Sequence, residues 1–347
     1  LALQPPPRHA AAVTPSTCPT ATLTRNCAPA LARPCALAAK PAPETPLSIR
    51  PQAELADRAR LPPGLLTIVP GAHAAPIGDE LCSNPIVRKF TFTGSTRIGK
   101  YLAAKCTETM KRTSMELGGN APVIVFDDAD LDKAAAGAAA SKYRNSGQTC
   151  ICANRILVQE GVYDEFVEKL KGVVGTFKVG DGMDETSTHG PVITRKALED
   201  IKSMVDDAVA HGAEVAAGGS FGEEGEQFIQ PTILCNVTED MRVFREEIFG
   251  PVAPIFKFKT EEEAIAMAND TEFGLAAYLF TKDQGRTWRV SEGIEYGMVG
   301  VNEVAISSTF IPFGGVKESG QGREGSSYGV DDYLEIKYIC IGDLGAD

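Results

Sequence analysis

The chain is an acidic sequence of 347 residues, 43% hydrophobic and 23% charged, which is ordinary for a globular protein and long enough for two domains. Its net charge of −12 and its lack of a Lys/Arg block argue against nucleic acid as a partner, and its apolar runs are all shorter than the roughly 18 residues of a membrane span. Nine cysteines are too sparse for a disulfide scaffold and four scattered histidines complete no zinc site, so we expect no metal and a reducing compartment, the cytoplasm or the mitochondrion.

The first 43 residues differ in composition from the rest of the chain. They contain no Asp or Glu, are rich in Ala and Pro and carry three arginines, which is typical of a disordered tail or an organellar transit peptide. From Lys40 onward the pattern becomes regular. It predicts, in chain order, a helix at 53–59, strands at 66–69 and 88–93, and a helix at 96–110.

The rest of the chain continues this alternation. The expected strands lie at 113–117 and 121–126, around a Gly118-Gly119 turn, at 298–302 and at 335–341. The expected helices lie at 134–143, capped by Asp130, at 162–171, at 195–211, stopped by Gly212, and at 260–269, opened by a capping box. Alternating short strands and helices predict an α/β fold with a doubly wound parallel sheet.

One cysteine lies in a context that suits a nucleophile. Cys150 follows the turn-forming residues 145–147 and precedes the apolar run 156–158, which places its sulfur near the start of a structured element. The N–H groups at such a start, or a nearby cation, stabilise a thiolate. A cysteine beside an aliphatic run is also a common core residue, and Cys150 with Cys152 would make half of a metal site, so the context alone leaves these alternatives open.

Five segments in the right order carry a family resemblance. They resemble the signature segments of the NAD(P)-dependent aldehyde dehydrogenase superfamily, and within it the chain is most similar to the succinate-semialdehyde dehydrogenase group, on residues 141–155 and 333–340. The match is dense from about Lys40 to the end. The five segments are 92–96, 115–120, 147–155, 246–251 and 312–320.

The resemblance implies a domain organisation. It implies a partial dinucleotide-binding domain at 1–115, an α/β catalytic domain at 116–325 and a C-terminal strand at 326–347 that pairs subunits in a homodimer or homotetramer. Under this resemblance, residues 1–43 are a weakly matching part of the family's sequence pattern and not a disordered tail. By that register the chain begins partway into the pattern, without the opening part of the cofactor domain.

The resemblance also assigns catalytic and cofactor roles. Cys150 matches the thiol nucleophile and Glu116 the general base, a role that asks for a carboxylate in apolar surroundings. As a lone residue, Glu116 would equally suit a solvated surface position, and 94–96 an ordinary strand-to-helix turn. The residues that match positions near NAD or NADP are Lys40, Pro43, Gly94, Ser95, Gly99, Leu117, Glu247 and Phe249. Pro43 stands where related enzymes often carry Glu or Ser, which leaves the choice between NAD and NADP open.

The remaining matches concern the substrate and regulation. Arg25, Arg144 and Ser307 match positions that face a substrate carboxylate, which favours succinate semialdehyde over an alkanal. Glutarate semialdehyde or another aldehyde remains an alternative. Thr17 stands where the family has an oxyanion-binding Asn, so an inactive or fragmentary homologue is the second alternative. Cys152 is either a bystander or a redox switch that pairs reversibly with Cys150.

Overall fold

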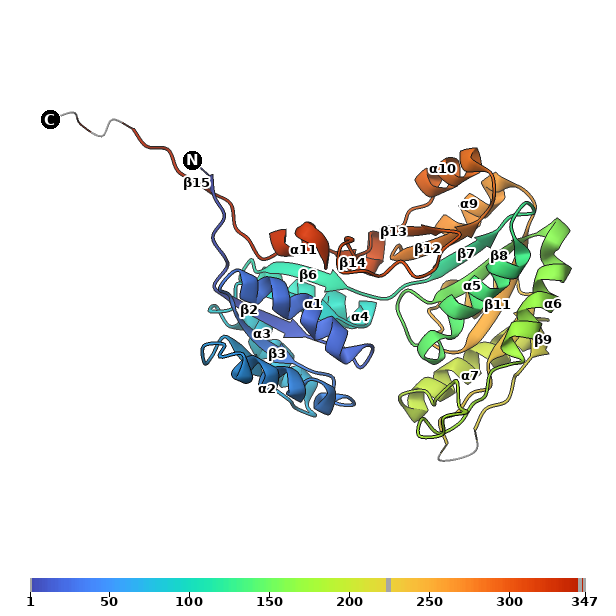
Figure 1. Cartoon of the computed structure of the whole chain (residues 1–347), viewed down its shortest axis with the longest axis horizontal. Coiled ribbons are helices and arrows are strands. Elements are labelled where there is room, and N and C mark those ends of the chain that lie inside the picture. Colours follow the sequence, from blue (N-terminus) through green and yellow to red (C-terminus); the bar gives the residue numbers. More distant parts are fainter. Residues whose placement is uncertain (1, 223–225, 343–344, 346–347) are drawn as a thin grey trace. The chain divides into compact units, whose positions relative to one another are not determined.

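The computed structural model describes residues 2–222, 226–342 and 345, and the chain folds into two compact units (Figure 1). The first unit comprises Leu1–Leu117, Ser308–Gly314 and Gly320–Asp347. The second unit comprises Gly118–Ser307 and Gly315–Ser319. The chain therefore leaves the first unit after β6, builds the second, and returns to finish the first.

The first unit is built on a six-stranded sheet in the order β14-β6-β5-β2-β3-β4. All neighbouring pairs are parallel except β14–β6. Strand β2 lies between β3 and β5, so the chain winds outward from β2 in both directions, which is the doubly wound order. The strands are β2 (His9–Val13), β3 (Ala36–Lys40), β4 (Leu66–Ile68), β5 (Lys89–Thr93), β6 (Arg112–Glu116) and β14 (Gly320–Gln321).

Helices cover both faces of this sheet, and strand β2 shows why. Ala10 and Ala12 belong to an apolar cluster with Leu23 of the first helix, whereas Ala11 belongs to another cluster, with Leu102 of a later helix. Successive side chains of a strand point to opposite faces, so a run of small apolar residues suits a strand that is buried on both sides. The helices are α1 (Pro19–Ala32), α2 (Arg50–Arg58), α3 (Ala74–Ser83), α4 (Thr96–Thr107) and α11 (Ser326–Asp331), with the short turn η1 (Pro46–Ser48).

Residues 1–43, whose composition alone is typical of a disordered tail, are folded over their described part, 2–43, as the family resemblance implies. The segment forms β2, α1 and β3, the first complete β-α-β step of the sheet. Its Ala-rich composition fills buried positions, since Ala11, Ala12, Ala30 and Ala39 are fully buried. The small apolar residues that suggested a tail are those that pack in the interior of the sheet and under α1.

The second unit contains a seven-stranded sheet in the order β13-β12-β7-β8-β11-β10-β9. Its pairs are parallel except β10–β9. The expected α/β fold with parallel sheets is confirmed. The strands are β7 (Ala121–Val125), β8 (Ala153–Gln159), β9 (Glu214–Ala217), β10 (Thr232–Cys235), β11 (Val252–Phe258), β12 (Ala276–Phe280) and β13 (Met298–Val301).

The helices of the second unit begin at the capping residues that the sequence indicates. Asp130 accepts a hydrogen bond from the N–H of Lys133, and Thr260 accepts one from the N–H of Glu263. One extended apolar cluster unites α7, α9, α10 and the sheet. The helices are α5 (Leu131–Tyr143), α6 (Tyr163–Val174), α7 (Arg195–Ala210), α8 (Arg242–Arg245), α9 (Glu261–Asn269) and α10 (Gln284–Gly293), with short turns η2 (Arg144–Gly147), η3 (Glu160–Val162) and η4 (Lys317–Ser319).

The two strands expected around Gly118-Gly119 are present as β6 and β7, and they belong to different sheets, because β6 lies in the first unit and β7 in the second. One expected strand differs from the structure. The late strand is β15 (Lys337–Tyr338), only two residues long, and it pairs antiparallel with β1 (Ala2–Leu3) of the same chain. Residues 343–344 and 346–347 of the expected C-terminal segment lie outside the described residues. In the described part of the chain, no helix is both long and apolar enough to cross a membrane.

Candidate active site

The predicted cofactor residues of the first unit gather at the carboxyl edge of its sheet. Lys40 ends β3, Gly94 and Ser95 follow β5, and Leu117 follows β6. Strand β2 ends nearby, since the N–H of Thr14 donates to the carbonyl of Lys40 at 3.0 Å. The point at which a doubly wound sheet reverses its order is where such folds bind dinucleotides, so this edge lies where a cofactor is expected.

Two hydroxyl groups at this edge support such a site. Thr14 and Thr93 follow or end the two central strands, β2 and β5, and their Oγ1 atoms are buried without a hydrogen-bond partner in the described structure. A buried polar atom without a partner costs free energy, on the order of 1–3 kcal/mol, and is retained where a ligand or water satisfies it. The sequence assigned a role to neither residue, although Thr93 lies within the segment 92–96 that carries part of the family resemblance.

Gly94, Ser95 and Gly99 lie at the start of α4. Ser95 is the residue before the helix and makes no side-chain cap, which leaves the first N–H groups of α4 to other partners. Gly99 is packed against Leu117, because a Cβ at this glycine would lie 2.2 Å from the Leu117 side chain. Gly94 packs on Phe92 in the same way, at 2.5 Å. Close packing against neighbouring side chains is thus a structural reason for both glycines.

Lys40 and Pro43 have contrasting surroundings. Lys40 is buried, and its Nζ donates to the carbonyl of Pro41 at 2.7 Å. Burial lowers the pKa of Lys40, and Glu44 partly offsets this effect. Pro43 is exposed. A proline presents no carboxylate that would repel a 2′-phosphate, so the surroundings admit both NAD and NADP.

Glu116, at the end of β6, is enclosed in the first unit. It is 2% exposed, and its Oε2 atom has no hydrogen-bond partner within the described residues. Its Oε1 lies against Gly314, because a Cβ on that glycine would be 2.9 Å away. Burial raises the pKa of Glu116 well above its ordinary value, Glu324 adds to the rise, and Arg323 and Arg25 offset part of it. A dry carboxylate of this kind holds or takes a proton readily.

Arg25 points into a network that sequence analysis did not predict. Its guanidinium lies 3.9 Å from Glu324 Oε2 and stacks on the Phe313 ring at 4.3 Å. Glu324 is buried and accepts a hydrogen bond from Asn26 Nδ2 at 2.9 Å. Burial raises the pKa of Glu324 as well. Arg25 therefore has a carboxylate partner within the protein, which competes with the predicted role toward a substrate carboxylate.

The nucleophile candidate lies in a strained turn of the second unit. Asn145, Ser146 and Gly147 all have left-handed backbone angles, with φ of 52°, 53° and 75°. A Cβ on Gly147 would lie 2.1 Å from the carbonyl oxygen of Gly250, so only glycine fits there. The turn brings Cys150 to a half-exposed position, three residues before β8.

The element that follows Cys150 along the chain is the strand β8 and not a helix. The N–H of Cys152 donates to the carbonyl of Thr149 at 2.9 Å, and that of Ala153 donates to Ser141 Oγ at 3.1 Å. The predicted stabilisation by N–H groups at the start of an element therefore does not come from these two residues. The hydroxyl of Thr149, next to the thiol, is buried without a partner among the described residues.

Glu247 reaches the segment beside Cys150. Its Oε1 accepts a hydrogen bond from the N–H of Gly119 at 2.9 Å. A Cβ on Gly119 would lie 2.2 Å from the carbonyl oxygen of Cys150, so these two backbones are in close contact. Burial raises the pKa of Glu247 to about 7, although the Gly119 N–H and the charge of Lys142 work against the rise. Three loops, before β7, β8 and β11, thus meet in the second unit.

Two buried residues, Lys142 and Cys152, lie near the place where these three loops meet. Lys142, near the end of α5, is 1% exposed, and burial lowers its pKa to about 8 while Cys152 and Glu247 act in the opposite direction. Cys152 is buried, with its Sγ 3.7 Å from the carbonyl oxygen of Arg144, and burial raises its pKa. All nine cysteines are free thiols. A raised pKa disfavours the thiolate form of Cys152.

The other predicted residues of the second unit are less closely assembled. Arg144 follows α5 directly and is exposed, and Ser307 is exposed in the stretch after β13. Phe249 has a left-handed φ of 50° and lies one residue before Gly250, which contacts the turn at Gly147. In the described parts of the chain, no group of three His, Cys, Asp or Glu side chains could hold a metal ion.

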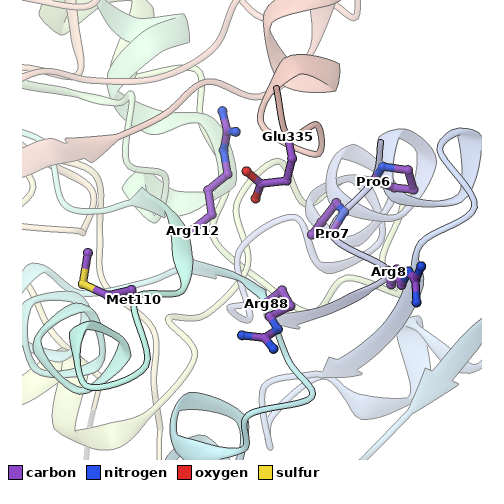
Figure 2. Close-up of a pocket in the computed structure, with 7 residues that line it drawn as sticks. All are labelled: Pro6, Pro7, Arg8, Arg88, Met110, Arg112 and Glu335. Atoms are coloured by element: carbon purple, nitrogen blue, oxygen red, sulfur yellow. The ribbon is translucent and has the colours of Figure 1, made fainter. Parts of the chain in front are cut away.

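One pocket of the first unit lies away from all of these residues (Figure 2). Its volume is about 530 Å³. Figure 2 shows the guanidinium groups of Arg8, Arg88 and Arg112 spread around it instead of converging on one point, with the Glu335 carboxylate on the Arg112 side. Arg112 is also occupied, since its Nη2 lies 3.8 Å from Asp332 Oδ1. This pocket is not part of the candidate site.

Comparisons with known proteins agree with the geometry of both units. The profile of the aldehyde dehydrogenase family matches residues 5–339. The chain is 55% identical over 332 residues to an NADP(+) succinate-semialdehyde dehydrogenase of Escherichia coli, which covers 96% of this chain and 69% of that protein. It is 54% identical over 334 residues to a glutarate-semialdehyde dehydrogenase of Pseudomonas aeruginosa, with coverage of 96% and 69%. A crystal structure of succinate-semialdehyde dehydrogenase from Burkholderia pseudomallei matches with a TM-score of 0.96 at 52% identity and covers 98% of this chain and 70% of that one.

Proposed function

The chain belongs to the aldehyde dehydrogenase family, and from that premise we propose that it oxidises succinate semialdehyde to succinate with NAD or NADP through a cysteine thioester. One observation carries the choice of nucleophile. In the run 146–158 every residue is buried except Cys150, which is half-exposed. A turn that buries its surroundings and leaves one thiol accessible suits a nucleophile better than a packing residue.

The proposed reaction divides the chemistry between two residues. The Cys150 thiolate adds to the aldehyde carbon and gives a tetrahedral oxyanion. The nicotinamide ring supplies the acceptor for the hydride that leaves this carbon. Glu116 then takes a proton from water, the resulting hydroxide attacks the thioester, and the acid and the free thiolate are released. The dry surroundings and raised pKa of Glu116 support its role as the base.

The predicted oxyanion site differs from that of the family at Thr17. Thr17 lies between β2 and α1 and is half-buried, and its carbonyl accepts a hydrogen bond from Thr22 Oγ1 at 3.3 Å. A hydroxyl at this position is a shorter donor than an Asn carboxamide. Loss of one oxyanion donor typically lowers the rate on the order of 10²- to 10³-fold. We therefore propose an active but slow enzyme.

The substrate proposal depends on the distal carboxylate. The exposed guanidinium of Arg144 supports it, because a planar donor fork binds a carboxylate in two places. Ser307 is exposed and would add a hydroxyl. Arg25 supports it less, since Glu324 already faces its guanidinium. Glutarate semialdehyde, with one more methylene, is the second candidate, favoured by the relative from Pseudomonas aeruginosa.

The cofactor proposal assigns the phosphate-bearing part to the first unit. The start of α4, the Thr14 and Thr93 hydroxyls and Lys40 lie at the carboxyl edge of its sheet, and we propose that they bind the dinucleotide. In the second unit Glu247 and Phe249 would contact the nicotinamide half. The named cofactor of the Escherichia coli relative supports NADP, and the absence of a carboxylate at Pro43 is compatible with that choice.

Compartment and assembly follow as lesser proposals. Nine free thiols suit a reducing compartment, the cytoplasm or the mitochondrion. The ribbon of β1 and β15 carries exposed Leu3, Ile336 and Tyr338, and we propose that it takes part in a homodimer or homotetramer. Cys152 stays a predicted redox partner of Cys150, with burial expected to slow the exchange.

The test measures absorbance at the reduced-nicotinamide band with succinate semialdehyde, glutarate semialdehyde and butanal, each with NAD and with NADP. We expect turnover of the carboxylated aldehydes, and a loss of their advantage over butanal in Arg144→Met. Cys150→Ala should be inactive, and Cys340→Ala, which removes an exposed thiol, should retain activity. Equal rates with butanal and succinate semialdehyde would contradict the substrate proposal. No turnover with any of the aldehydes would favour an inactive homologue.

A further inference from the structure

A buried lysine of the first unit has no role in the proposed reaction. Lys89 begins β5, in the middle of the sheet, and its side chain is fully buried. Its Nζ lies 5.3 Å from the centre of the Tyr333 ring and 3.8 Å from Asp332 Oδ2. Burial lowers the pKa of Lys89 to about 8, and Asp332 opposes this most strongly. A buried ammonium is costly unless its partners hold it in place.

Lys89 starts a chain of three hydrogen-bonding groups. Its Nζ donates to Ser114 Oγ, and Ser114 Oγ donates in turn to Asp332 Oδ2 at 2.5 Å. These groups come from β5, from β6 and from the residue after α11. We call Lys89, Ser114 and Asp332 together the Asp332 catch.

The catch holds a segment that returns to the sheet late in the chain. Asp332 Oδ2 also accepts a hydrogen bond from the N–H of Arg323 at 3.2 Å. Gly322 lies tightly against it, because a Cβ there would be 2.5 Å from Asp332 Oδ2 and 2.8 Å from Ser114 Oγ. Its φ of 85° is a second reason for glycine at this point. The segment 320–323 is therefore held next to β6 by its strand pairing and by the contacts of Gly322 and Arg323 with Asp332.

This segment is part of what encloses Glu116. Gly320 pairs with Glu116 across β14 and β6. Gly314, which touches Glu116 Oε1, would with a Cβ also lie 2.8 Å from the carbonyl oxygen of Gly322 and from the Arg323 side chain. Ser114 and Glu116 are two residues apart on β6, so their side chains point to the same face. Ser114, the middle member of the catch, and Glu116 thus share one face of β6.

We propose that the Asp332 catch is a positioning device for Glu116, which holds segment 320–323 and Gly314 in place and so keeps water from the carboxylate. Its members are positioning residues and touch no reacting atom. The inference rests on the proposed function in one respect: Glu116 is the residue whose environment matters for thioester hydrolysis. The enclosure itself can be measured without turnover.

Four charged groups act on the pKa of Glu116. They are Glu324 and Arg323 on the segment after β14, Arg25 on α1 and Asp332 after α11. Ser114→Ala removes a neutral hydroxyl and none of these charges. If the segment loosens in this variant, water reaches Glu116 and stabilises the ionised form, so its titration moves to lower pH. Asp332→Asn should move it the same way, with an added contribution from the lost negative charge.

The experiment is a pH titration of the full-length protein followed by infrared difference spectroscopy of protonated carboxyl groups, with Glu116→Gln used to identify the band of Glu116. We expect the Ser114→Ala midpoint to move to lower pH by on the order of one unit relative to the unmodified chain. Thr107→Ala is the control: it deletes an exposed threonine hydroxyl at the end of α4, which donates a hydrogen bond to the carbonyl of Ala104 and not to segment 320–323 or to Asp332. Its midpoint should not move.

The second readout is the pH profile of thioester hydrolysis in single turnovers. The acid limb of this profile should move with the infrared midpoint in Ser114→Ala and stay in place in Thr107→Ala. An unchanged infrared midpoint in folded Ser114→Ala would overturn the inference. If Ser114→Ala does not fold, Asp332→Asn takes its place, and an unchanged midpoint there has the same meaning. Full hydrolysis by Glu116→Gln would instead overturn the proposed function and leave the infrared result standing.

Discussion

Each unit contributes one glutamate to the predicted site, Glu116 buried and Glu247 half-buried, and the two carboxylates lie in opposite surroundings. Glu116 of the first unit has an oxygen without a partner among the described residues, and the first neighbouring charge that acts on it is another carboxylate, Glu324. Glu247 of the second unit accepts the Gly119 N–H, and the neighbouring charge that acts on it is the ammonium of Lys142. Burial raises the pKa of both.

This difference in surroundings suits the two carboxylates to two different roles. A carboxylate without donors gains little by staying ionised, so it suits the transfer of a proton. A carboxylate that is held by an N–H and faced by a cation has a fixed orientation, so it suits the binding of hydroxyl groups such as those of a ribose. The comparison predicts that the two glutamates fail in different ways when their charge is removed.

The largest expected effect is on hydrolysis. Glu116→Gln should lower steady-state turnover about 10²- to 10⁴-fold, because it removes a general base, and it should leave a first burst of reduced cofactor. Glu247→Gln should instead raise the KM for the cofactor with a smaller change in the burst. Stopped-flow absorbance at the reduced-nicotinamide band separates the two. Loss of the burst in both variants would contradict the assignment of different roles to the two glutamates.

The next effect concerns the oxyanion at the start of α1. Thr17→Asn should raise the rate of aldehyde oxidation by up to about 10²- to 10³-fold, because a carboxamide is the longer donor. Thr20→Asn, at an exposed position one helical turn along, is the matched control and should change little. Steady-state kcat with a carboxylated aldehyde is the measurement. A Thr17→Asn enzyme no faster than the unmodified chain would show that oxyanion binding is already sufficient.

The smallest effect is on stability. Folding raises the pKa of Glu247 from 4.5 to about 7, so between these values the folded state holds a proton that the unfolded state has lost. Stability from this group is therefore lost as pH rises through that window. Glu247→Gln has no such loss. Its Tm, compared with that of the unmodified chain, should improve between pH 5 and pH 8, by a modest amount since Glu247 is half-buried. A difference in Tm that does not change with pH would contradict the shift.

The fold was largely predictable because its signals are local. Asp130 and Thr260 mark helix starts, and the alternation of strands and helices predicts the parallel sheets that the structure contains. The family resemblance is confirmed as well. Composition misled at the beginning of the chain, where alanines that fill a doubly covered sheet resemble those of a tail.

The candidate site was predictable only as separate segments. The site roles of Cys150, Glu116 and Glu247 rest on short motifs and stay predictions. Their partners could not be inferred, because the pattern around Ser114 says nothing of Asp332, and that around Asn26 says nothing of Glu324. Such pairs form only when distant segments meet, and no local periodicity records them. The unpartnered hydroxyl of Thr93 is likewise a property of the assembled sheet.

The order in which the two units are encoded has a consequence for folding on the ribosome. The second unit is nearly continuous, whereas the first is completed by residues from 308 onward. The Asn26–Glu324 and Ser114–Asp332 hydrogen bonds join residues 298 and 218 positions apart, so the loops that they close are long and their formation is slow. During synthesis the second unit can therefore fold while the first still lacks β14 and α11. The enclosure of Glu116 is then among the last features of the chain to form, and premature termination would abolish it while leaving Cys150 in place.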